Sequence, residues 1–116
     1  MKFLCLAYEE EAALNALSHP EWDALRRETL AYVEILKKSG HLILTNALQS
    51  ARMAATVRVR DAGLSVVDGP YAETREQLGG FYLIEAENLD RAVEIARQIP
   101  AVTHGTIEIR PIATYG

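Results

Sequence analysis

Three short runs of this sequence constrain the fold more than any other feature. They are FLCLAY near the N-terminus, HLILTNAL in the middle and FYLIEA in the second half. Each run carries apolar side chains at consecutive positions, which is typical of strands that are covered on both faces. A sheet built from these runs therefore needs a layer of protein on each side.

Capping signals divide the rest of the chain into elements. Lys2 to Tyr8 is predicted to form the first strand. The residues after it are expected to form one or two helical turns or only a loop with helical character. Ser18 and Glu21 have the spacing of a capping box, and Pro20 fits the first turn of the helix that this box begins. Gly40 is expected to end that helix. The inward face of the helix is predicted to consist of Trp22, Leu25, Thr29, Tyr32 and Leu36, with Leu30 and Val33 beside them.

The remaining elements are expected to be mainly strands. Their predicted ranges are 41–48, 56–60, 64–68, 80–86 and 105–111. The strict alternation over 56–60 predicts one buried and one solvated face, and the turn 61–63 makes it a hairpin with 64–68. Asn88 is expected to cap a second helix that ends before Pro100. Its inward face is predicted to be Leu89, Ala92, Val93, Ala96 and Ile99.

The resulting order, β-α-β-(β-β)-β-α-β, predicts an α+β fold in a single domain over residues 1–116. It is the ferredoxin-like split β-α-β arrangement with an extra central hairpin. Two helices cover only one face of such a sheet. Because large exposed apolar patches are rare on soluble monomers, we expect a second copy to cover the other face, giving a homodimer.

Composition excludes several classes of function. A net charge of −4 gives no basic surface for nucleic acid. Cys5 is the only cysteine, so no intrachain disulfide or thiolate cluster can form, and its apolar run indicates a buried side chain. The opening residues lead directly into a run that is too short for a signal sequence or a membrane span. We therefore expect a cytoplasmic protein without a membrane partner.

The segment DGPYAETREQLGG, residues 68–80, is where we expect the functional site. It is polar, rich in glycine and longer than most connections. Asp68 is the candidate catalytic base, and the alternative is a turn residue that accepts backbone hydrogen bonds. His104, just before the last strand, is its candidate titratable partner. Asp68→Asn separates the alternatives, because only a catalytic role predicts lost activity in an intact fold.

Further residues are candidates for binding a small polar ligand. They are Tyr8, Tyr71, Glu73, Arg75 and Glu76. Each has an alternative: the charged residues can form a solvated loop or an intersubunit salt bridge, and the tyrosines can belong to the core. The three histidines lack the spacing of a metal site, and no phosphate-binding glycine motif is present. We therefore expect no metal and no cofactor.

The same segment, followed by FYLIEA, resembles the signature of the DGPF-domain proteins of the YCII-related family. The resemblance extends to MKFLCLAY, ALQSARMAATVRVRD, DRAVEIARQIP and GTIEIRPI, and so covers nearly the whole chain. Tyr71 replaces the family's phenylalanine and Arg75 its lysine. The resemblance implies a dimeric α+β barrel.

The resemblance also bears on function. Many YCII-like proteins suggest an active site made of a histidine on the first helix and an aspartate before a proline. Here the first helix carries Trp22, Glu28 and Tyr32 and no histidine beyond His19 at its very start. Ile99 precedes Pro100 where the aspartate would be expected, so that mechanism does not transfer. The DGPF branch resembles proteins found beside or fused to sigma factors. This implies an alternative function, a non-catalytic ligand sensor or interaction module linked to transcription regulation.

Overall fold

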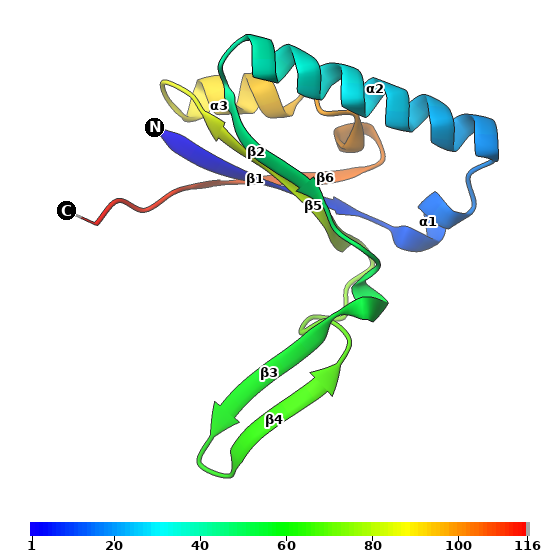
Figure 1. Ribbon diagram of the computed structural model, residues 1–116, viewed down its shortest axis with the longest axis vertical. Helices are drawn as coiled ribbons and strands as arrows, with labels where there is room; N and C mark the ends of the chain where they lie inside the picture. Colours follow the sequence, from blue (N-terminus) through cyan, green and yellow to red (C-terminus); the bar gives the residue numbers. More distant parts are fainter. Residues whose placement is uncertain (116) are drawn as a thin grey trace.

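The computed structural model describes residues 1–115 and contains a four-stranded sheet and a separate hairpin (Figure 1). The sheet has the antiparallel order β2-β5-β1-β6. Its strands are β1 (Lys2–Glu9), β2 (Leu42–Ala47), β5 (Gln77–Glu85) and β6 (Gly105–Pro111). The hairpin consists of β3 (Ala55–Arg60) and β4 (Gly63–Asp68). The helices are α1 (Glu11–Asn15), α2 (His19–Lys38) and α3 (Leu89–Ala96), with single 3₁₀ turns η1 (Ala51–Met53) and η2 (Pro100–Thr103). The α+β class and the ferredoxin-like order with a central hairpin are confirmed.

Local signals set the ends of α2 as the sequence predicted. The Ser18 hydroxyl accepts a hydrogen bond from the Glu21 amide, and the Glu21 carboxylate accepts one from the Ser18 amide. At the other end, Gly40 adopts a φ of 79° and the His41 amide donates to the Leu36 carbonyl. These contacts form a Schellman motif, in which a left-handed glycine stops the helix.

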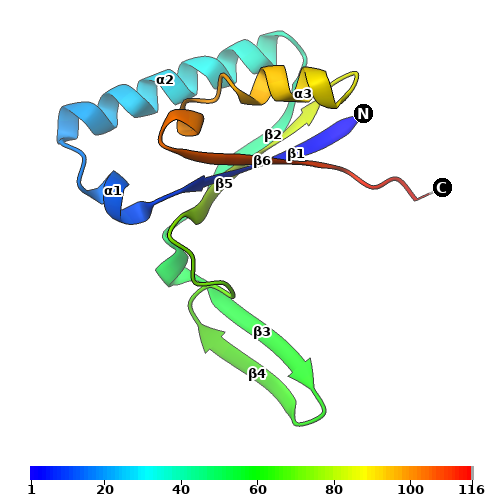
Figure 2. The ribbon, with the colours of Figure 1, turned by 180° about the vertical axis from the view of Figure 1, so that it is seen from behind.

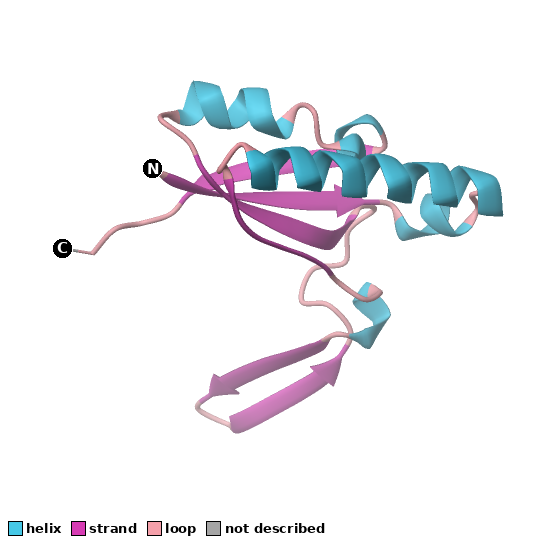
Figure 3. Ribbon diagram, turned by 45° about the horizontal axis from the view of Figure 1, so that its top comes forward, coloured by secondary structure: helices cyan, strands magenta, loops and turns pink. Residues whose placement is uncertain are grey.

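The core lies between the sheet and the two long helices, which cover the same face (Figure 3). Phe3, Cys5, Ile84 and Ile99 are fully buried there. Burial raises the pKa of the Cys5 thiol to about 11, so this group is a packed apolar side chain rather than a reactive thiolate. The predicted burial of Cys5 is confirmed.

The inward faces of the helices differ in part from the predicted ones. Trp22 and Leu30 are exposed, because the first turns of α2 extend beyond the strands and Leu30 lies at the flank of the buried stripe. In α3, Leu89 and Val93 are also exposed. The helix presents Ile95 to the core instead, together with Ala92 and Ala96. An apolar residue at the margin of a stripe is the one that periodicity places least well.

The hairpin of residues 55–68, here called the arm, projects from the sheet as a separate ribbon (Figure 2). Within a single chain the predicted burial of one of its faces is wrong, since all but one of its twelve strand residues are exposed. Its projection gives the chain a radius of gyration of 16.2 Å, against about 13 Å for a compact domain of this length. Residues of β3 alternate between apolar and polar as in a packed strand, but the apolar side chains stay exposed within residues 1–115.

The sheet also has an uncovered face, opposite the helices. Its centre is apolar and its β6 edge is polar. We call this the open face; its residues are Leu4, Leu6, Tyr8, Leu44, Asn46, Phe81, Leu83, Thr106, Glu108 and Arg110. The arm hangs on this side of the sheet (Figures 1 and 2). A partner packed on the open face would therefore lie beside the arm.

Candidate functional site

A pocket of about 550 Å³ lies where the end of the open face meets the segment 70–78 and the turn η1. β5 begins at Gln77, three residues earlier than predicted, so the connection after the arm spans only residues 69–76. No helical turn forms at Thr74 to Gln77. We call this cavity the Tyr8 pocket. Its lining is Tyr8, Leu48, Gln49, Ser50, Ala51, Met53, Ala54, Pro70, Ala72, Thr74, Gln77 and Leu78.

The lining of the Tyr8 pocket contains no charged side chain. Its polar groups are held by a short network of hydrogen bonds. The Gln77 side chain accepts from the Glu11 amide at 3.0 Å and donates to the Thr74 carbonyl at 2.6 Å. The Glu11 carboxylate in turn accepts from the Ser50 hydroxyl at 2.9 Å and the Ala51 amide at 2.7 Å. Glu11 therefore links the start of α1 to η1 and to the start of β5.

Two polar groups of the lining remain available to a ligand. The Gln49 side chain makes no hydrogen bond to the described part of the chain. The Tyr8 hydroxyl donates to Glu108 over 3.4 Å, a long and therefore weak bond. Burial and the neighbouring Glu108 carboxylate raise the pKa of Tyr8, so its hydroxyl stays protonated and can donate. The pocket thus offers a phenol and an amide beside apolar surface from Leu48, Met53 and Leu78.

A cluster of titratable groups lies at the same end of the sheet. Glu76 accepts a hydrogen bond from the Thr106 hydroxyl at 2.8 Å. Glu9, the last residue of β1, continues the inward alternation of Phe3, Cys5 and Ala7, and it pairs with Gly105. Burial raises the pKa of the Glu9 carboxyl above its ordinary value. The electrostatic interaction with His104 lowers this pKa, and that with Glu76 raises it further. A carboxyl group perturbed in this way is a candidate for proton transfer.

Replacing Glu9 with glutamine should stabilise the protein at neutral pH. A carboxyl whose pKa is raised by folding adds stability only at low pH, and that contribution is lost as the pH rises through the folded pKa. At pH 7 the ionised, half-buried Glu9 is therefore a cost that Glu9→Gln removes. Thermal melts should show a higher Tm for the variant at pH 7 and a shrinking difference toward pH 4. Glu87→Gln, at an exposed site, is the control; an equal gain there, or no pH dependence, would contradict the assignment.

The structure brings only some of the predicted site residues together. Tyr8, Glu76 and His104 lie at the end of the sheet described above. Arg75 forms an ion pair with Glu10, with 3.3 Å between Nε and Oε2; the Arg75 side chain faces solvent and that of Glu10 is partly buried. Glu73 is exposed in the connection.

Asp68 lies at the base of the arm, opposite Ala55 and exposed. Within residues 1–115 its side chain makes no hydrogen bond or ion pair, so neither a contact with His104 nor an Asx turn is seen. The turn is fixed by its neighbour Gly69, which has a φ of 101° and donates to the Ala54 carbonyl at 2.7 Å. A catalytic role for Asp68 therefore stays a prediction.

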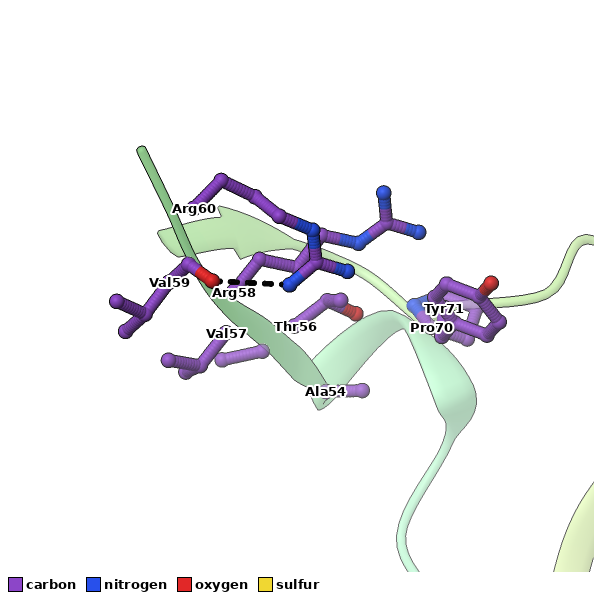
Figure 4. A pocket seen from close by; sticks show the side chains of 9 residues that line it. Ala54, Thr56, Val57, Arg58, Val59, Arg60, Pro70 and Tyr71 are labelled. Atoms are coloured by element: carbon purple, nitrogen blue, oxygen red, sulfur yellow. Dashed lines mark hydrogen bonds between the residues drawn. The ribbon is translucent and has the colours of Figure 1, made fainter. Parts of the chain in front are cut away.

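Tyr71 belongs to a second, shallower hollow on the arm (Figure 4). The Arg58 guanidinium lies 4.9 Å from the centre of the Tyr71 ring, within the range of a cation–π interaction. Arg60 extends on the same side and donates to the Val59 carbonyl. This hollow is about 580 Å³ and open to solvent, and it shares only Ala54 and Pro70 with the Tyr8 pocket.

Residues 1–115 contain no group of three or more histidine, cysteine, aspartate or glutamate side chains placed to hold a metal ion. No helix in this part of the chain has both the length and the apolar character needed to cross a membrane.

Comparison with known proteins decides the family. The family model of the YCII-related domain matches residues 1–115. The chain belongs to the YCII-related family. A curated relative, the uncharacterised protein R00369 of Rhizobium meliloti (strain 1021), is 36% identical over 117 residues, covering 99% of this chain and 94% of the relative.

A solved structure shares the fold of this YCII-related chain. It is 5-chloro-2-hydroxyhydroquinone dehydrochlorinase (TftG) from Burkholderia phenoliruptrix AC1100, in complex with 2,5-dihydroxybenzoquinone. The TM-score is 0.59 and the alignment covers 97% of this chain and 94% of the other, with 16% sequence identity. At this identity the likeness supports the α+β fold and not a shared activity.

Sequence reasoning missed Glu9, Gln49 and Gln77 in this YCII-related domain. A signal existed for Glu9, because a charged residue at an inward position of a strand is unusual. Gln49 and Gln77 carried no comparable signal. Their place in the pocket depends on how the turn η1 packs against the start of β5, which is a tertiary contact.

Proposed function

We propose that this YCII-related protein binds a small, uncharged, ring-sized organic molecule with hydroxyl or carbonyl oxygens in the Tyr8 pocket. The observation that carries the proposal is the lining itself. It combines apolar surface with a phenol held only by a long bond to Glu108 and with an amide that makes no hydrogen bond within residues 1–115, and its lining residues are uncharged. Such a lining favours neutral ligands, because a charged ligand would lose hydration without gaining an ion pair. The 2,5-dihydroxybenzoquinone bound to the structural neighbour has this size and shape.

A catalytic role for the site is a further part of the proposal. Asp68 and His104 are the proposed catalytic residues, with Glu9 and Glu76 beside His104 as additional proton donors or acceptors. Tyr71, Glu73 and Arg75 are proposed to contact the ligand only when the connection 69–76 closes over the pocket. Asp68→Asn should abolish any turnover found with phenolic or quinoid substrates while leaving the melting temperature unchanged. A loss of several degrees in Tm would instead assign Asp68 a structural role.

We also propose that the protein is a cytoplasmic homodimer formed through the open face. The solvent-accessible surface of one chain is 8409 Å². A compact monomer of this mass exposes about 6300 Å², so the excess is about 2100 Å². That excess is more than twice the roughly 800 Å² that each partner buries in a standard interface. Two open faces packed together would cover the apolar centre formed by Leu4, Leu83 and their neighbours.

The second candidate function is a ligand sensor or interaction module linked to transcription regulation. The exposed arm favours it, because an unpaired ribbon with an apolar face is a common recognition element. A sensor would bind the same ligand in the Tyr8 pocket without converting it. Product analysis after long incubation with saturating ligand distinguishes the two functions.

Binding of hydroquinone, followed by NMR chemical-shift changes, tests the pocket. Its matched probe is 2,5-dihydroxybenzoate, which adds a carboxylate to the same ring. We expect hydroquinone to bind more tightly, and Tyr8→Phe or Gln49→Leu to weaken it about threefold to tenfold, the value of one hydrogen bond. Gln98→Leu, at an exposed position outside the pocket lining, is the control. Tighter binding of the carboxylate, or binding that neither pocket variant affects, would contradict the proposal.

A further inference from the structure

The strand register of the arm gives it one apolar face and one mainly polar face. Cross-strand partners in an antiparallel pair lie on the same face. Val57 pairs with Val66 and Val59 with Leu64, which places four apolar side chains on one face. Arg58 pairs with Ser65 and Thr56 with Val67, which makes the other face mainly polar. Figure 4 shows Arg58 and Arg60 extending away from the side taken by Val57 and Val59.

The apolar face of the arm is uncovered in a single chain. Val57, Val59, Leu64 and Val66 are 60%, 69%, 70% and 60% exposed. They are adjacent, so they form one continuous patch rather than scattered surface residues. An isolated two-stranded hairpin is marginal in water and needs a hydrophobic face to pack against something. The alternation of residues in the arm is therefore adapted to a contact that one chain does not supply.

The polar face, by contrast, is engaged with its own chain. The Thr56 hydroxyl donates to the Gly69 carbonyl at 2.9 Å, and the Tyr71 ring lies under Arg58. These contacts anchor the base of the arm to the connection 69–76. They leave the opposite, apolar face free to meet a partner.

We propose that the apolar face of the arm packs on a second copy of this chain, so that each protomer clasps its partner. This rests on the proposed pairing through the open face and extends it to a second contact. Two observations favour a second copy as the occupant. The arm hangs on the open-face side of the sheet, where that copy would lie (Figures 1 and 2). The excess surface of about 2100 Å² per chain is also larger than the roughly 800 Å² that each partner buries in a standard interface, which leaves area for a second contact with the same copy.

The clasp also predicts where Asp68 lies in the dimer. In the register of the arm, Asp68 pairs with Ala55 and lies on the apolar face, next to Val57 and Val66. A carboxylate at the edge of a patch that packs on a partner becomes partly desolvated by that partner. The clasp therefore brings Asp68 to the contact between the two copies, which is where a site shared by both protomers would form.

Two neighbouring valines provide a matched test. Val66 and Val67 are 60% and 58% exposed, and they lie on opposite faces of β4. We expect Val66→Lys to raise the dimer dissociation constant at least tenfold in sedimentation velocity, while Val67→Lys leaves it unchanged. Both variants should keep the wild-type circular dichroism spectrum, since neither side chain is buried in the protomer.

The outcomes separate the clasp from the pairing it rests on. A wild-type dimer whose dissociation constant is the same in Val66→Lys would overturn the clasp and leave the open-face pairing standing. A wild-type protein that is monomeric at every concentration would overturn both, and the patch would then belong to a different partner. An equal effect of Val67→Lys would also overturn the clasp, because it would show that neither face is specific.

Discussion

Replacing Gly105 with alanine is expected to lower the free energy of unfolding by about 3 kcal/mol or more, the upper range for overpacking a core. A Cβ atom at this position would lie 2.0 Å from the Tyr8 carbonyl oxygen and 3.2 Å from the Glu9 Cα. Both are backbone atoms of the neighbouring strand β1, so no side chain can move aside. β1 and β6 would have to separate at the end of the sheet that holds Glu9 and His104. Chemical denaturation of wild type and variant measures the loss.

Gly79 supplies the control for this substitution. It lies in β5 of the same sheet, and its added Cβ would meet only atoms at 3.9 Å and 4.0 Å. Gly79→Ala should therefore change stability by less than about 1 kcal/mol. If Gly105→Ala and Gly79→Ala unfolded at the same denaturant concentration, the close approach of β1 and β6 would be wrong.

Replacing Leu83 with lysine is expected to convert the protein from a dimer to a monomer. Leu83 lies at the apolar centre of the open face, between its cross-strand partners Leu4 and Leu44. A lysine there would bury an unpaired charge in the proposed dimer, whereas in the monomer it reaches water. Static light scattering should fall from twice the 12.9 kDa chain mass to that mass itself.

Ile35→Lys is the control for the open face. Ile35 is exposed on the outer surface of α2, away from the sheet. This variant should keep the wild-type mass. A dimer that survives Leu83→Lys, or one that Ile35→Lys dissociates equally well, would contradict pairing through the open face.

The parts of the fold that local chemistry determines were predictable from the sequence. The capping box at Ser18, the glycine stop at Gly40 and the alternation of β6 each depend on residues a few positions apart. The burial of the arm was not predictable in this way. The alternation in β3 predicts that one face of the arm is apolar. It does not predict whether that face packs on the same chain or on another one.

The candidate site was predictable in location and only partly in composition. The segment after Asp68 does border a pocket, and Tyr8 does line it. The charged residues that drew attention in the sequence, Glu73 and Arg75, face solvent instead. The pattern of polar residues identifies the connection 69–76. Which side chains of this connection line the pocket depends on where β5 begins and on how η1 packs against it. Neither is encoded in local spacing.

The most direct test of the central claim is a crystal structure of the protein grown with hydroquinone. The proposal predicts density for one ring in the Tyr8 pocket, with an oxygen within hydrogen-bonding distance of the Tyr8 hydroxyl or the Gln49 amide. Ordered hydroquinone bound only elsewhere, with the Tyr8 pocket empty at saturating concentration, would contradict it.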